Sequence, residues 1–138
     1  MKTQVLFLCT GNSCRSQMAE GWLRHLAGDR FAVASAGTKP GSLNRTAVQV
    51  MGECGVDISG HHSKSVDEFV QQAFDCVITV CDNVKESCPV FPGGGRRLHW
   101  SFQDPAAAQG TEEQRLAVFR RVRDQIEQRI REFLQQES

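Results

Sequence analysis

The chain has 138 residues and a mass of 15.3 kDa, which is the size of one domain and too short for two ordinary domains. Its 16 Lys and Arg residues balance 16 Asp and Glu residues, so no net charge attracts nucleic acid or an anionic membrane. Its apolar runs are far shorter than the roughly 18 residues of a membrane span, and its first residues do not resemble a signal peptide. We therefore expect one cytoplasmic domain over residues 1–138 that binds neither nucleic acid nor membrane.

Strand-forming runs and amphipathic helical segments alternate along the chain. The expected strands are residues 4–9, 31–35, 75–80 and 97–100. The expected helices are residues 16–27, 45–54, 65–74 and a long last helix whose start, Thr111 to Gln114, has the pattern of a capping box. This alternation predicts an α/β fold, a three-layer sandwich in which helices flank a parallel sheet.

Cysteine is the most informative residue type in the composition. The six cysteines are Cys9, Cys14, Cys54, Cys76, Cys81 and Cys88. A domain of this length in a reducing compartment does not need disulfides for stability, so its cysteines are more often catalytic, metal-binding or core residues. We expect Cys54, on a predicted helix, and Cys76, in a predicted strand, to be small core residues.

The loop between the first strand and the first helix has the composition of an anion site. It reads Cys9-Thr10-Gly11-Asn12-Ser13-Cys14-Arg15-Ser16. Its short side chains let successive backbone N–H groups turn inward beside a helix N-terminus, which together bind oxyanions. Arg15 can hold two oxygens at once, and Cys9 would lie at the floor, where the positive field favours the thiolate and the Ser16 hydroxyl can bond the sulfur. This predicts nucleophilic attack by Cys9 on a bound oxyanion; the alternative is a buried strand cysteine followed by a surface arginine.

The loop resembles the phosphate-binding loop of the low-molecular-weight protein tyrosine phosphatases, and residues 9–21 are still more similar to the arsenate reductases built on that fold. Further matching stretches are Ser35-Ala36-Gly37, residues 56–59, His99-Trp100 and residues 104–106. The resemblance implies a four-stranded parallel sheet and arsenate held by Thr10, Gly11, Asn12, Ser13, Cys14, Arg15 and Ser16. Cys14 is expected to be a structural member of the loop. We further expect a monomer with no bound metal or cofactor.

Two more cysteines distinguish a reductase from a phosphatase. Cys81 directly follows the third predicted strand, which places it at the same sheet edge as Cys9, and Cys88 comes seven residues later in a segment rich in Pro and Gly. Resemblance to the thioredoxin-coupled arsenate reductases implies a relay in which a Cys9–Cys81 disulfide becomes a Cys81–Cys88 disulfide. The electrons then come from reduced thioredoxin or another thiol reductant. The alternatives are idle core cysteines or zinc ligands, although the Cys-x6-Cys spacing does not match the usual zinc spacing.

Asp104, followed by Pro105, matches the position where this fold keeps its general acid. A carboxyl group aimed at the anion site can protonate a departing oxygen, and in the reductases this aspartate can instead tune the Cys9 thiol. Asp-Pro is also an ordinary turn starter. The alternative function is hydrolysis of a phosphomonoester or phosphotyrosine, with Cys9, Arg15 and Asp104 in the same roles and water as the final nucleophile.

One departure from the family pattern concerns charge near the loop. Some relatives have an alkali-cation site that involves residues matching Asn12 and Glu20 together with positions near His62 and Lys64. Here Lys64 stands where an acid is often found, and its ammonium group would repel a cation. We expect a protein that does not depend on potassium, in which Lys64 itself takes that charge role.

Overall fold

The computed structural model describes residues 2–81 and 95–137. Its elements are β1 (Thr3–Cys9), α1 (Arg15–Ala27), β2 (Phe31–Gly37), α2 (Arg45–Gly52), the 3-10 helix η1 (Val66–Phe69), β3 (Cys76–Thr79), β4 (Arg96–His99), the 3-10 helix η2 (Pro105–Ala107) and α3 (Glu112–Glu137). The strands form one parallel sheet in the order β2-β1-β3-β4. The predicted four-stranded parallel sheet of an α/β fold is confirmed.

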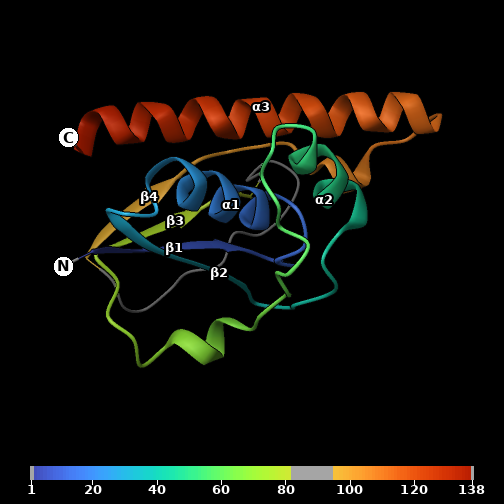
Figure 1. Ribbon diagram of the computed structural model, residues 1–138. Helices are drawn as coiled ribbons and strands as arrows, with labels where there is room; N and C mark the ends of the chain where they lie inside the picture. The colour runs from blue at the N-terminus through green and yellow to red at the C-terminus, as the bar shows by residue number, and fades with distance from the viewer. Residues whose placement is uncertain (1, 82–94, 138) are drawn as a thin grey trace.

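The two faces of the sheet are covered unequally. Successive side chains of a strand point to opposite faces, so Val5, Phe7 and Cys9 of β1 join the larger core, while Leu6 and Leu8 join a smaller one. The helices α1, α2 and α3 lie on the larger-core side, with α3 across the top of α1, and η1 lies on the other side (Figure 1). Cys9 therefore faces α1. None of the helices within the described residues has the length and hydropathy to cross a membrane.

Register places two of the predicted site cysteines at one edge of the sheet. Leu8 of β1 pairs with Thr79 of β3, and the Val80 backbone N–H donates to the Leu8 carbonyl at 3.0 Å. Cys9 ends β1, and Cys81 lies two residues beyond the end of β3. Both cysteines thus lie at the carboxyl ends of neighbouring strands, as predicted. Cys88 lies outside the described residues.

The helix predicted over residues 65–74 is wrong beyond its start. Ser65 forms the capping box with Glu68, but the 3-10 helix η1 ends at Phe69. No residue of η1 is buried, and Val70 is 45% exposed. Val66 and Phe69 pack against the smaller core, but residues 70–73 are exposed, so a longer helix would bury no further apolar surface. Packing of an apolar face is what stabilises a short helix in a protein.

Cys54 is exposed, so its prediction as a core residue is wrong, whereas Cys76 is buried in β3 as predicted. The helix α2 ends at Gly52, and the following turn has Gly55 at a φ of 78°. Cys54 therefore leaves the helix before it could turn toward the core. The capping box of α3 is confirmed, because Thr111 and Gln114 exchange hydrogen bonds of 2.9 and 3.1 Å.

Candidate active site

Two hydrogen-bonding groups lie against the sulfur of Cys9. The Asn12 backbone N–H donates to Sγ at 3.2 Å, and the Ser16 Oγ lies 2.9 Å from Sγ. Asn12 has a positive φ of 51°, which turns its N–H back toward the end of β1. Ser16 stands in the first turn of α1, where the helix carries partial positive charge. The predicted contact between Ser16 and the sulfur is therefore present, and the site suits a negative charge on sulfur.

The loop encloses a pocket of about 250 Å³ above this sulfur. It is lined by Cys9, Thr10, Gly11, Ser13, Cys14, Arg15 and Asp104. The structure thus brings Asp104 to the predicted loop across a long sequence separation. Asn12 and Ser16, also predicted as binding residues, are fully buried members of the loop and do not line the pocket.

Arg15 and Asp104 form one side of the pocket. The Arg15 side chain is 6% exposed, its Nη1 donates to the Phe102 carbonyl at 3.2 Å, and its Nη2 lies 3.8 Å from Asp104 Oδ2. The other Asp104 oxygen accepts the Ala106 N–H at 3.0 Å, which holds the carboxylate at the start of η2. The buried position of Arg15 excludes the alternative in which it is a surface residue.

Cys14 shares the loop and the pocket lining but has different surroundings. Its sulfur has a long contact of 3.9 Å from the Ser13 hydroxyl. Burial raises the pKa of the Cys14 thiol to about 12, although the Ser13 bond opposes the shift. Burial also raises the pKa of Cys76 to about 11. Both thiols are protonated at neutral pH and are poor nucleophiles there.

Cys81 is fully buried at the sheet edge that carries Cys9. It is disulfide-bonded, and none of the four other described cysteines is its partner, because Cys9, Cys14, Cys54 and Cys76 are free thiols. Cys88 falls outside the part of the chain that the structure describes, so its predicted role stays a prediction.

A polar network behind the loop was missed by the sequence reasoning. The Asn12 side-chain amide donates to Ser35 Oγ at 3.0 Å, and its Oδ1 accepts from Gln17 Nε2 at 3.0 Å. The Asn12 carbonyl accepts from Ser63 Oγ at 2.7 Å. The position of Ser35 near the end of the strand beside β1 was a usable signal. Gln17 and Ser63 carry no comparable signal, because only the fold brings them to the loop.

The fold and the pocket at the end of β1 are shared with a known family. The chain matches the family described as low molecular weight phosphotyrosine protein phosphatase over residues 4–137. It belongs to this family.

Within the family, the chain is similar to proteins named arsenate reductase. One from Bacillus subtilis is 50% identical over 129 residues, covering 94% of this chain and 93% of that protein. A solved arsenate reductase in a phosphate-binding state superposes with a TM-score of 0.83 at 36% identity over the whole of both chains. A thioredoxin-dependent arsenate reductase from Corynebacterium glutamicum has a TM-score of 0.74 at 31% identity, covering 98% of this chain and 61% of that one. The resemblance predicted from residues 9–21 is confirmed.

Proposed function

We propose that this protein reduces arsenate to arsenite, with Cys9 as the nucleophile. The observation that carries the proposal is the pairing of an anion pocket with a second buried cysteine. The Cys9 sulfur lies at the pocket floor beside Arg15 and Asp104, and Cys81 follows the neighbouring strand. Relatives that are named arsenate reductases over nearly the whole chain support this choice of oxyanion.

Arsenate is a tetrahedral oxyanion, and the loop offers groups suited to it. The backbone of Thr10, Gly11 and Ser13 lines the pocket at the N-terminal end of α1, and Arg15 supplies a buried guanidinium. Backbone N–H groups at a helix N-terminus and an arginine fork both favour such anions. The Cys9 sulfur then forms a bond to arsenic, and one arsenate oxygen leaves after protonation, a proton that Asp104 is placed to give.

The reduction needs two electrons, which a pair of thiols supplies. The Cys81 thiolate attacks the Cys9 sulfur, and the electron pair of the sulfur–arsenic bond stays on arsenic. Arsenic passes from As(V) to As(III) and leaves as arsenite, while the two sulfurs lose two electrons and form a Cys9–Cys81 disulfide. A disulfide needs the two Cα atoms within roughly 7 Å of each other, and Cys81 comes two residues after the end of the strand that pairs with β1.

A third thiol completes the relay in our proposal. Cys88 attacks the Cys81 sulfur, which releases Cys9 as a thiolate and leaves a Cys81–Cys88 disulfide. A free Cys9 next to a disulfide-bonded Cys81 is the state that this step would leave. Reduced thioredoxin then supplies two electrons and is itself oxidised, as the thioredoxin-dependent relative suggests. The reaction requires no bound cofactor and no second copy of the chain, and it requires a reducing compartment such as the cytoplasm.

The proposal is tested by coupling arsenate to NADPH oxidation through thioredoxin and thioredoxin reductase. We expect NADPH oxidation that depends on arsenate, on thioredoxin and on this protein. Glutaredoxin with glutathione, run in parallel, identifies the reductant. Absence of arsenate-dependent oxidation with every reductant would overturn the proposal.

The order of the relay is tested with Cys88→Ser. We expect about one arsenite per protein, followed by a stalled Cys9–Cys81 disulfide that mass spectrometry of the unreduced peptides identifies. Sustained turnover of this variant with thioredoxin contradicts the order. Cys54→Ser is the matched control, because Cys54 is exposed and takes no part in the relay.

Hydrolysis of aryl phosphates is the second candidate function. The observation in its favour is that Cys9, Arg15 and Asp104 meet in one pocket, and these three groups are sufficient for attack on a phosphate monoester. Turnover of an aryl phosphate, measured beside the arsenate assay, decides between the two. Robust phosphate release with no arsenate signal would reverse the ranking.

A further inference from the structure

Every carbonyl group from Cys9 to Cys14 accepts a hydrogen bond from a residue outside the pocket lining. Four of these donors are backbone N–H groups of residues 38–44, which follow β2. They are Thr38 to the Cys9 carbonyl at 3.3 Å, Lys39 to Thr10 at 2.9 Å, Gly41 to Gly11 at 3.0 Å and Asn44 to Ser13 at 3.0 Å. The other two carbonyls bond to the side chains of Gln17 and Ser63 and to the N–H of Met18. The carbonyl groups of the loop therefore point away from the pocket.

These bonds determine which way the N–H groups of the loop point. In a planar trans peptide, the C=O of one residue and the N–H of the next point in opposite directions. The peptide bonds of the described residues are trans. Asn12 shows the consequence directly, because the Gly11 carbonyl before it bonds to Gly41 and the Asn12 N–H points to the Cys9 sulfur at 3.2 Å. The N–H groups that follow the other outward carbonyls face inward by the same geometry.

Gly37, the last residue of β2, lies in very close contact with this loop. A Cβ atom at Gly37 would collide with the Thr10 carbonyl oxygen and would lie 3.0 Å from the Asn12 backbone nitrogen. Gly37 does not have a positive φ, so the backbone conformation itself would accept an alanine. The close approach of two backbone segments is therefore what requires glycine at this position.

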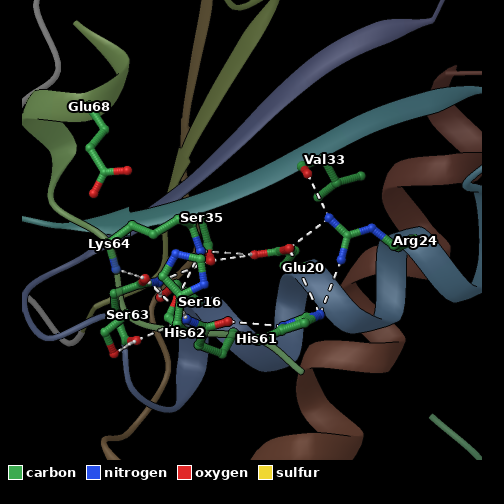
Figure 2. A network of polar contacts seen from close by, with 12 residues as sticks. Ser16, Glu20, Arg24, Val33, Ser35, His61, His62, Ser63, Lys64 and Glu68 are labelled. Carbon is green, nitrogen blue, oxygen red and sulfur yellow. Dashed lines mark hydrogen bonds and ion pairs between the residues drawn. The ribbon is translucent and has the colours of Figure 1, made fainter. Parts of the chain in front are cut away.

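The end of β2 is held in place beside the loop. Seven register pairs join β2 to β1. The Gly37 N–H donates to the Lys64 carbonyl at 2.9 Å, and Gly37 forms a parallel bridge with Ser65. Figure 2 shows Lys64 against β2, close to Ser35. A side chain added at Gly37 would therefore displace the loop more readily than the strand.

We infer that residues 37–44 are a positioning segment for the oxyanion site. Their N–H groups hold the loop carbonyls outward, and Gly37, which has no Cβ atom, allows the loop to stay against β2 with its own N–H groups facing the anion. None of residues 37–44, all of which the structure describes, lines the pocket, so the segment acts through the loop. The inference rests on the loop being the anion site of the proposed function.

The test measures oxyanion binding without turnover. Inorganic phosphate, a tetrahedral oxyanion like arsenate, is titrated against the rate at which iodoacetamide labels the Cys9 sulfur of the fully reduced protein. Labelling is read by mass spectrometry of the tryptic peptide of residues 3–15. We expect phosphate to protect the wild type. Gly37→Ala should need at least about ten-fold more phosphate for half protection, because a displaced loop loses more than one N–H bond to the anion.

Gly41→Ala is the matched control within the same segment. The Gly41 N–H also donates to a loop carbonyl, that of Gly11, but a Cβ atom at Gly41 would meet nothing within 4 Å. We expect Gly41→Ala to bind phosphate as the wild type does. A folded Gly37→Ala with wild-type phosphate binding overturns the inference, and so does an equal loss of binding in Gly41→Ala.

Amide NMR separates a displaced loop from a general loss of structure. In the wild type, phosphate should shift the backbone N–H signals of Gly11, Ser13 and Cys14. In Gly37→Ala these phosphate-induced shifts should shrink, while the N–H signals of α3 keep their wild-type positions. Full phosphate-induced shifts at Gly11 and Ser13 in this variant contradict the inference.

A backbone ester tests the segment even if Gly37→Ala does not fold. Replacing Lys39 by its α-hydroxy analogue removes the N–H that donates to the Thr10 carbonyl and keeps the side chain. We expect half protection to need about two to five times more phosphate, the effect of one backbone hydrogen bond. The same replacement at Gln72, whose N–H donates to the Phe69 carbonyl, should leave phosphate binding unchanged. Wild-type phosphate binding by the Lys39 ester overturns the inference.

Phosphate binding and arsenate reduction are separate readouts. Phosphate protection of Cys9 needs no electrons and no second thiol. A wild type that binds phosphate but does not reduce arsenate would therefore overturn the proposed function and leave the role of residues 37–44 standing. A wild type that neither phosphate nor arsenate protects would overturn the oxyanion site itself, and the inference with it.

Discussion

Cys9 and Cys14 lie in the same loop, line the same pocket and are each 3% exposed, yet their sulfurs have opposite surroundings. The Cys9 sulfur has the Asn12 N–H and the Ser16 hydroxyl at 3.2 and 2.9 Å. The Cys14 sulfur has one distant hydroxyl, and burial raises its pKa to about 12. Two thiols of equal exposure in one loop therefore differ in the hydrogen-bonding groups beside the sulfur.

The difference follows from where each cysteine falls along the loop. Cys9 is the last residue of β1, so its side chain points into the concave side of the turn that the loop makes before α1. Cys14 occupies the N-cap position of α1 and makes no capping hydrogen bond with its side chain. Five residues of separation thus give one sulfur two close hydrogen-bonding groups and the other a single distant hydroxyl.

The largest expected effect comes from replacing Cys9, and replacement of Cys14 is the comparison. Cys9→Ser should lose at least about 10⁴-fold in turnover, because a serine hydroxyl without an adjacent base is a far weaker nucleophile. Cys14→Ala should keep turnover within about ten-fold, since a thiol protonated at neutral pH adds no nucleophile. Both are measured by arsenate-dependent NADPH oxidation, with thermal unfolding as the control for folding. Comparable losses of turnover in the two variants would contradict the different roles assigned to Cys9 and Cys14.

A smaller but still large effect is expected for Arg15→Lys. The lysine keeps the charge but loses the planar fork that can hold two oxygens and donate to the Phe102 carbonyl. We expect kcat/KM for arsenate to fall about 10²-fold, the size of effect seen when one donor to a developing charge is removed. The rate at which iodoacetamide labels the Cys9 sulfur should change much less than turnover. Wild-type kcat/KM in Arg15→Lys would mean that backbone N–H groups alone bind the anion.

Asp104→Asn should lower kcat by about 10²-fold, the lower range for loss of a general acid. The asparagine no longer places a negative charge 3.8 Å from Arg15, so KM for arsenate should stay the same or fall. Steady-state kinetics at several arsenate concentrations separate the two constants. A rise in KM with unchanged kcat would assign Asp104 to substrate binding rather than to proton transfer.

The smallest expected effect is a loss of stability at high pH caused by Cys14. Its thiol ionises near the ordinary value when unfolded and near 12 when folded, so the unfolded state loses its proton first. Stability from this group is complete well below pH 9 and falls as the pH rises toward 12, by about 1.4 kcal/mol at pH 10. Urea unfolding at pH 8 and pH 10 should show a smaller loss for Cys14→Ala than for the wild type. Equal losses would place the Cys14 thiol in contact with water.

The parts of the site that were predicted from the sequence are contiguous or sit at strand ends. Residues 9–16 combine a strand end, a glycine and a helix start in one stretch, so local rules suffice to predict an anion-binding loop at Cys9. Cys81 was predicted to lie at the same sheet edge as Cys9, because it directly follows a predicted strand and parallel strands have their carboxyl ends at one edge. Asp104 was placed through the resemblance to a known family.

The parts that were wrong depend on what else the chain can bury. The helix expected over residues 65–74 stops at Phe69, because Val66 and Phe69 pack against the smaller core but residues 70–73 are exposed. Cys54 is exposed because α2 ends two residues earlier. A capping box or an apolar period identifies where a helix can begin. It does not report whether a surface exists for the helix to cover.

The sequence by itself determined the parallel α/β sheet, the loop that holds Cys9 and Arg15, and the edge that Cys81 shares with Cys9. Each of these follows from residues close together in the chain or from the common direction of parallel strands. Only the tertiary structure decided that Glu20, Ser35 and Lys64 gather behind Asn12, because α1, β2 and the segment before η1 supply one group each. These contacts join residues far apart in the chain, and no local pattern encodes them.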